Sequence, residues 1–217
     1  MADSAFFCPL THEGVLAVRG ADAAKFLQGQ LTCNLNYLSD TQASLGARCT
    51  QKGRMQSSFR ILLQGDGVLL AMATELLEPQ LADLKKYAVF SKSKLTDESA
   101  AWARFGLANA DQALASLGLE LPAATDSVAR SEQLIAIRVS PGRTELWAPA
   151  EQAEAVRSQL AAQLQTQFGG LMVGEYVRHF IDHHQRDTTL ADIPAIARGQ
   201  LAWEDAARAE RPALLIL

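Results

Sequence analysis

Residues Met55 to Thr74 read MQSSFRILLQGDGVLLAMAT, in which two apolar runs are separated by a short glycine-rich segment. The runs cover residues 55–63 and 68–74, and Gly65, Asp66 and Gly67 lie between them. Paired glycines and the Asp-Gly step permit the positive backbone angles that a tight hairpin needs. We therefore predict two neighbouring antiparallel strands joined by this turn.

The residues on either side of this hairpin predict further strands and two helices. Residues 15–19, 45–50 and 94–96 are expected to be extended. Ala23, Phe26, Leu27 and Leu31 recur at the spacing of a helix that covers a sheet, and a second amphipathic helix is predicted over residues 75–87.

The pattern restarts at about residue 101. Strands are predicted over residues 102–108, 134–139 and 144–148, helices over 110–117 and 151–165, and a polar loop over 120–131. The predicted fold class is α+β, with antiparallel sheets covered by helices. Three regions follow: an α+β module over 1–100, a second α+β module over 101–168, and a mainly helical or irregular tail over 169–217.

Composition restricts the class of protein. The chain has 217 residues, of which 48% are apolar and 20% charged, with a net charge of -4. This composition is typical of a globular protein, and the net negative charge is unfavourable for extensive nucleic-acid binding, although a local basic patch stays possible.

The three cysteines show no C-x-x-C spacing, the N-terminus shows no export signal, and no apolar run approaches the length of a membrane span. We expect a cytoplasmic protein without a membrane partner.

Two basic segments are candidates for ligand binding. In the first, Gly53 lies between Lys52 and Arg54, so the backbone can approach a ligand while the cations meet carboxylates or phosphates. In the second, Lys85-Lys86-Tyr87-Ala88-Val89-Phe90-Ser91-Lys92-Ser93-Lys94, four lysines are interleaved with two aromatic residues at the C-terminus of a predicted helix. A solvated turn and simple complementation of the helix dipole are the structural alternatives.

Other chemistry has weaker support. His179 and His183 have the i, i+4 spacing of metal ligands, and Asp182 and Asp187 are nearby, but no third ligand is specified and no metal is expected. The chain contains no G-x-S-x-G, Walker A or G-x-G-x-x-G sequence. No catalytic residue is assigned.

Three blocks of sequence resemble the YgfZ-type folate-binding proteins, which are relatives of the glycine-cleavage T-protein, an aminomethyltransferase. The blocks are Val18-Arg19-Gly20-Ala21-Asp22 with the segment 26–34, Lys52-Gly53-Arg54-Met55 to Arg60, and the segment 84–92. The resemblance implies ferredoxin-like modules that bind tetrahydrofolate or a derivative. It also implies a role in maintaining iron-sulfur enzymes, which would be partners, and an effect on tRNA modification.

The resemblance and the two basic segments together give a predicted folate site. Its residues are Lys52, Gly53, Arg54, Ser57, Arg60, Lys86, Tyr87 and Lys92. A pterin ring needs a flat wall and a few directed polar groups, and a glutamate tail needs cations.

The chain also departs from the family pattern. Ser57 and Ser58 stand where the T-protein carries acids, so aminomethyl transfer by that route is not expected. The hallmark K-G-C-Y-x-G-Q-E and a C-terminal β domain are missing, which predicts a member truncated, divergent or altered in reading frame after about residue 168. Two alternatives stay open: a folate-dependent aminomethyltransferase using Asp22, Glu13 or a tail residue, and a non-catalytic interaction module that self-associates.

Overall fold

The structure is a computed structural model that describes residues 5–131, 133–166, 171–172 and 215–216. Its contacts divide the chain into two units, Met1–Gln165 and Thr166–Leu217. The strands are β1 Phe6–Pro9, β2 Glu13–Arg19, β3 Ser44–Cys49, β4 Met55–Gln64, β5 Gly67–Ala73, β6 Lys94–Asp97, β7 Trp102–Ala108, β8 Val128–Ser131, β9 Leu134–Ser140, β10 Arg143–Pro149, β11 Gln165–Thr166, β12 Leu171–Met172 and β13 Leu215–Ile216. The helices are α1 Ala23–Gln28, α2 Thr74–Tyr87, α3 Asp111–Ser116 and α4 Ala153–Gln163, with short 3-10 turns η1 Leu35–Tyr37, η2 Ser99–Ala101 and η3 Ala150–Gln152.

The first sheet has five strands in the order β3-β4-β5-β2-β6, and all of its pairings are antiparallel. The predicted hairpin is confirmed, with Gln64 paired to Gly67 and Gly65 at a φ of 59°. Gly67 is required for a steric reason, because a Cβ there would lie 2.4 Å from the Val18 carbonyl oxygen.

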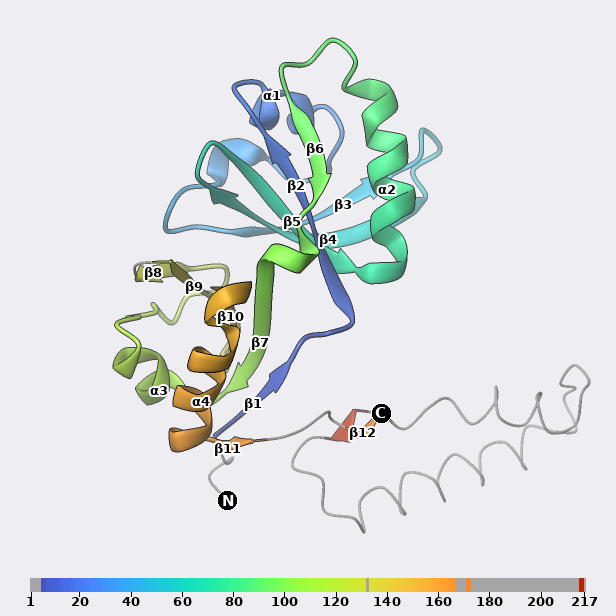
Figure 1. Cartoon of the computed structure of the whole chain (residues 1–217). Helices are drawn as coiled ribbons and strands as arrows, with labels where there is room; N and C mark the ends of the chain where they lie inside the picture. Colours follow the sequence, from blue (N-terminus) through green and yellow to red (C-terminus); the bar gives the residue numbers. More distant parts are fainter. Residues whose placement is uncertain (1–4, 132, 167–170, 173–214, 217) are drawn as a thin grey trace, which may run out of the picture. The chain divides into compact units, whose positions relative to one another are not determined.

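One face of this first sheet is covered by α1 and α2 (Figure 1). The helices bury apolar side chains at the predicted spacing, including Leu27 of α1 and Leu77 and Leu84 of α2. They pack on inward residues of the sheet such as Phe59 and Ile61 of β4. The two helices predicted from the apolar spacing are confirmed as α1 and α2. Helix α1 ends at Gln28, earlier than predicted.

The second sheet has the order β11-β1-β7-β10-β9-β8, and α3 and α4 cover its outer face. It takes most strands from residues after 101, but also β1, which pairs with β7 and which the sequence did not predict. The chain therefore passes between the sheets twice, from β1 to β2 and from β6 to β7 (Figure 1).

The inner faces of the two sheets pack on each other. Val15, Leu62 and Leu69 of the first sheet share a buried cluster with Ile135 and Trp147 of the second. The first unit therefore has four layers: helices, sheet, sheet and helices. This confirms the predicted fold class of α+β with antiparallel sheets covered by helices.

Two details of the second half differ from the prediction. The segment predicted as a loop over 120–131 ends in a strand, β8, because Val128 is buried between the sheets and Arg130 donates hydrogen bonds to the backbone oxygens of Asp40 and Leu63. Helix α4 ends at Gln163, two residues before the predicted end.

In the tail, β12 pairs with β13 in parallel, and the rest of the predicted helical or irregular tail lies outside the described residues. No described helix is long and apolar enough to cross a membrane.

Candidate functional site

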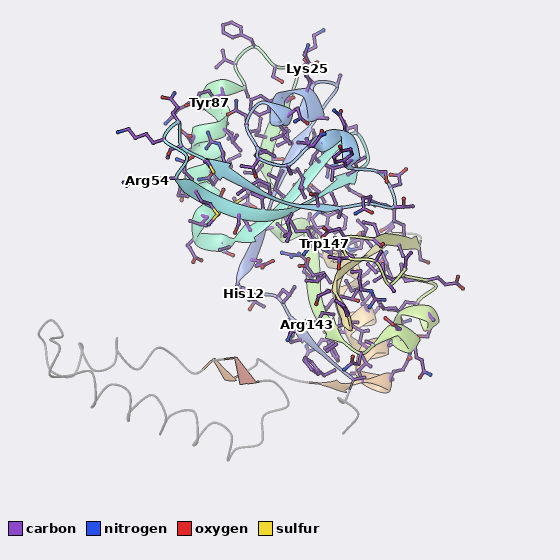
Figure 2. All side chains as sticks on the ribbon, turned by 180° about the vertical axis from the view of Figure 1, so that it is seen from behind. His12, Lys25, Arg54, Tyr87, Arg143 and Trp147 are labelled. Carbon is purple, nitrogen blue, oxygen red and sulfur yellow. The ribbon has the colours of Figure 1, made fainter. Side chains whose placement is uncertain are left out.

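A cleft of about 520 Å³ lies between the turn that joins β3 to β4 and the C-terminal half of α2. Its volume is within the usual range for small-molecule sites. Its lining residues are Arg48, Cys49, Thr50, Gln51, Lys52, Arg54, Gln56, Asp83 and Tyr87. Figure 2 shows Arg54 in the turn between β3 and β4 and Tyr87 at the end of α2.

The turn that carries the cations is built by hydrogen bonds to Thr50. The Gly53 N–H donates to the Thr50 carbonyl oxygen at 2.9 Å, and the Arg54 N–H donates to the Thr50 hydroxyl at 3.2 Å. Gly53 has a φ of 73°, which favours glycine, and there is open space where a Cβ would project. Lys52 and Arg54 are consequently exposed on a short, well-bonded turn.

Arg48 connects the strand side of the cleft to the helix side. This side chain of β3 is buried, and its guanidinium donates to Gln80 Oε1 at 3.2 Å and pairs with Asp83 Oδ2 at 2.7 Å. The Tyr87 ring covers it, with 5.7 Å between the guanidinium carbon and the ring centroid. A buried cation needs such partners to offset its lost hydration.

Asp83 is the one acid among the described residues that line the cleft. The hydrogen bond from Arg48, and then that from Lys86 at 3.2 Å, hold the pKa of Asp83 below its usual value. The carboxylate therefore stays ionised at neutral pH, and its unused lone pairs can accept further hydrogen bonds.

Ser57 lies on the same sheet face as this network. It is opposite Arg48 in the register between β3 and β4, and it is buried. Its hydroxyl oxygen has no hydrogen-bond partner among the described residues. A buried unpaired hydroxyl costs free energy and indicates a polar group that an additional ligand or water can satisfy.

The structure brings some of the predicted folate residues together and separates others. Lys52, Arg54 and Tyr87 line the cleft, Gly53 lies in its turn, Lys86 is bonded to Asp83, and Ser57 is opposite Arg48.

Two predicted residues lie elsewhere. Arg60 faces the second sheet, where it pairs with Asp126 and with Glu145 Oε1 at 3.5 Å. Lys92 belongs to the loop after α2, and its backbone N–H donates to Asp22 Oδ2 at 2.9 Å. Neither residue lines the cleft.

Sequence reasoning did not select Arg48, Gln80 or Asp83. The available signals were a cation inside a predicted strand and two polar residues at i and i+3 of the predicted helix. Tyr87 follows Asp83 at i+4, so the polar side of this helix leads to the aromatic residue that was selected.

The acids considered for aminomethyl transfer are engaged away from this cleft. Glu13 pairs with Arg104 at 2.6 Å, and Asp22 accepts the Lys92 N–H. Within the described residues, no group of three metal-ligating side chains is arranged to hold an ion. His179 and His183, together with Asp182 and Asp187, lie outside the described residues.

Comparison with solved structures defines the class of fold. The chain superimposes on the glycine-cleavage aminomethyltransferase T of Bartonella henselae with a TM-score of 0.65, at 18% identity, over 77% of this chain and 48% of that one. A heterotetrameric sarcosine oxidase of Corynebacterium sp. U-96 matches with a TM-score of 0.51, at 14% identity, over 75% and 84% of the two chains. The fold is therefore of the T-protein aminomethyltransferase type.

Comparison with curated proteins is more specific. A tRNA-modifying protein YgfZ of Vibrio vulnificus is 34% identical over 152 residues, which are 70% of this chain and 46% of that protein. The YgfZ proteins of Yersinia pseudotuberculosis and Escherichia coli O157:H7 are 36% identical over 155 residues and 41% identical over 115 residues, respectively. The predicted resemblance to YgfZ-type proteins is confirmed.

The match extends over part of each relative. The chain spans about half the length of the Vibrio and Yersinia proteins, 46% and 47%, and 35% of the Escherichia protein. No protein-family model matches the chain.

Proposed function

We propose that the chain binds tetrahydrofolate or a derivative in the cleft between the β3–β4 turn and α2. The observation that carries this proposal is the Arg48 network: a buried guanidinium held by Gln80 and Asp83 and covered by the Tyr87 ring. It provides a wall with an aromatic surface, while Lys52 and Arg54 provide exposed cations on the opposite side.

The chemistry of these residues fits the two ends of a folate. The ionised Asp83 accepts hydrogen bonds from the N–H groups of a pterin, and the exposed part of Tyr87 offers a face for stacking. Lys52 and Arg54 pair with the carboxylates of the glutamate tail. Tetrahydrofolate, when bound, supplies a carrier for one-carbon groups.

We propose binding rather than aminomethyl transfer. Ser57 and Ser58 offer hydroxyl groups and no carboxylate, and Asp83 is already paired with Arg48 and Lys86. A general base with two cationic partners is weakened, because its proton affinity is lowered. Aminomethyl transfer would therefore require an acid that the described cleft residues do not provide.

The wider role that we propose follows the relatives' name and the implied family role: support of iron-sulfur enzymes and of tRNA modification in the cytoplasm. Expression of the chain in a bacterium lacking its own YgfZ protein tests this role. Restored tRNA modification supports it, and unchanged modification despite soluble expression contradicts it.

Calorimetric titration of the full chain with tetrahydrofolate tests the cleft. Calorimetry is suited to this because Trp102 and Trp147 lie outside the cleft lining and would report binding poorly. We expect Lys52→Ala combined with Arg54→Ala to weaken binding by about tenfold, since two charge-assisted contacts are lost.

A matched control is Arg143→Ala, which removes an exposed cation from the second sheet. It should bind as the wild type does. If the Lys52→Ala, Arg54→Ala variant binds tetrahydrofolate with the wild-type affinity, folate binds outside the cleft. If the wild type gives no heat of binding at millimolar tetrahydrofolate, the proposal of folate binding is wrong.

A further inference from the structure

The lysines of the chain are distributed very unevenly. All six lie between residues 25 and 94, and none lies in the 123 residues from 95 to 217. Four of them lie in the last turn of α2 or just after it, namely Lys85, Lys86, Lys92 and Lys94, and Lys25 lies on α1. All five are exposed.

The loop from Ala88 to Ser93 presents apolar side chains among these lysines. Phe90 is 99% exposed and Val89 is 71% exposed, although both are large enough to gain from burial. Isolated exposed apolar residues are common, but two neighbours at the tip of a loop form a small unpartnered patch. In Figure 1 this loop, between α2 and β6, projects at the end of the first sheet.

The backbone of the loop is held in place. The Ser91 N–H donates to the Ala88 carbonyl oxygen at 2.9 Å, and the Lys92 N–H donates to Asp22 Oδ2 at 2.9 Å. Gly20 lies directly beneath, where a Cβ would be 2.5 Å from the Lys92 carbonyl oxygen. The exposure of Phe90 is thus fixed by a bonded loop that also brings α1, with Lys25, to the same end of the unit (Figure 2).

Little negative charge offsets these lysines. The carboxylate of Asp22 accepts the Lys92 N–H, and Asp83 is paired with Arg48 and Lys86. The chain as a whole carries a net charge of -4, so the local excess of positive charge contrasts with the rest of the protein. Such a local field attracts a polyanion.

We propose that this loop surface, formed by Lys25, Lys85, Val89, Phe90, Lys92 and Lys94, binds single-stranded nucleic acid. The lysines contact successive phosphates, and Phe90 stacks on an unpaired base. Aromatic side chains with surrounding cations bind single strands in this way. The inference does not rest on folate binding, because Val89, Phe90 and Lys94 do not line the cleft.

Two other partners fit the surface less well. A membrane-binding element needs a broad apolar face to enter the lipid, whereas this loop offers two apolar side chains. A stable protein interface buries about 800 Å² on each partner around a packed centre, and a projecting loop tip does not provide such a centre. A flexible strand that carries both phosphates and unpaired bases matches a surface that offers several exposed lysines around one exposed aromatic ring.

Fluorescence anisotropy of a labelled oligouridine RNA of about 12 nucleotides, titrated with the full chain, tests the proposal. With three phosphate contacts, affinity should fall about twentyfold between 50 and 200 mM salt. Phe90→Ala should weaken binding about tenfold, and Lys92→Ala combined with Lys94→Ala should weaken it and flatten the salt dependence.

Matched controls are Tyr37→Ala, which removes another exposed aromatic ring, and Arg143→Ala, which removes an exposed cation on the second sheet. Both should bind RNA as the wild type does. Absence of binding at low salt, or equal binding by the Phe90→Ala variant, overturns the proposal. So does Phe90-dependent binding to phosphatidylserine vesicles without RNA binding.

The same variants separate this inference from the proposed function. Phe90→Ala should bind tetrahydrofolate as the wild type does, whereas Lys52→Ala combined with Arg54→Ala should lose folate affinity and retain the effect of Phe90 on RNA. A loss of folate binding alone therefore contradicts the cleft proposal and leaves the nucleic-acid proposal standing.

Discussion

Arg48 shows how one buried cation determines the geometry of the candidate site. Its hydration is lost, so each of its partners has to be positioned: Gln80 and Asp83 by their spacing on α2, and Tyr87 by a further helical turn. These residues make the helix side of the cleft rigid. The cations on the turn side stay exposed and can adapt to a ligand.

A second charged pair lies away from the cleft, between the last residue of β2 and the residue after β6, and gives a pH prediction. Arg19 donates to both carboxylate oxygens of Glu98, at 3.0 and 2.7 Å. This hydrogen bonding lowers the pKa of Glu98 from its ordinary value of 4.5, and burial opposes the shift. Because the folded-state pKa is depressed, the stabilisation is complete above pH 4.5 and is lost as the pH falls further.

Glu98→Gln should therefore lower the free energy of unfolding at pH 7 by about 1 kcal/mol. The difference from the wild type should shrink as the pH is lowered below 4.5, because protonation then removes the same charge from the wild type. Urea unfolding at several pH values measures this. Glu120→Gln, at an exposed loop position, is the control, and a Glu98→Gln difference that is constant with pH contradicts the prediction.

Gly20 gives a steric prediction at the residue scale. Its φ is 112°, and an added Cβ would lie 2.5 Å from the Lys92 backbone oxygen. Gly20→Ala should destabilise the protein by about 2 kcal/mol or more, since both the backbone conformation and the loop above it must shift.

Gly29 provides the matched control for this substitution. It has a φ of -84°, and the nearest atom to an added Cβ is the Phe26 oxygen at 3.7 Å. Gly29→Ala should change the stability by less than about 0.5 kcal/mol. Thermal unfolding of the two variants compares them, and equal melting temperatures would show that the Lys92 loop yields without cost.

At the scale of elements, the predicted strands and helices largely agree with the structure because their apolar periods are clear. The sequence could not show which face of β4 each side chain occupies. The first sheet is buried on both faces, by helices on one and by the second sheet on the other, so alternation between apolar and polar residues disappears along β5 and much of β4. Arg60 was placed with the folate residues through the family resemblance, although its odd spacing from Ser57 puts the two side chains on opposite faces of β4 and Arg60 faces Glu145.

The remaining site residues were missed for a related reason. Arg48 and Asp83 acquire their importance from a contact between β3 and α2, which are separated by two strands in the sequence. Local spacing cannot reveal such a contact. In contrast, Lys52, Gly53 and Arg54 form a local turn, which local sequence spacing can indicate.

The position of Arg60 leads to a prediction about β4. Arg60 is buried and pairs with Asp126 and Glu145 between the sheets, so Arg60→Ala removes the cation that faces Asp126 and one of the two that face Glu145, which keeps Arg104. We expect a loss of about 3 kcal/mol in the free energy of unfolding. Folate affinity, measured by calorimetry under conditions where the variant is folded, should stay unchanged.

The Lys52→Ala, Arg54→Ala variant is the natural counterpart. It should keep the wild-type stability, because both side chains are exposed, and lose folate affinity. If Arg60→Ala instead weakens folate binding without a change in stability, the ligand lies between the sheets and not in the cleft.

At the scale of the whole molecule, the two sheets of the first unit share a core. Leu62 and Leu69 of the first sheet lie in one buried cluster with Ile135 and Trp147 of the second. The chain also passes between the sheets twice. Neither sheet can therefore bury its inner face without the other, which predicts one cooperative unfolding transition for the unit.

Leu62→Ala tests this coupling, because Leu62 is fully buried in β4 while both tryptophans of the described residues, Trp102 and Trp147, lie in the second sheet. A cavity at Leu62 should cost about 2–5 kcal/mol. In a Trp203→Phe background, tryptophan fluorescence reports Trp102 and Trp147, which belong to the second sheet, and its urea midpoint should fall together with that of far-UV circular dichroism. Leu45→Ala, which is 60% exposed on β3, should move neither midpoint. A fluorescence midpoint unaffected by Leu62→Ala would mean that the sheets unfold separately, and the cleft on the first sheet could then open without disturbing the second.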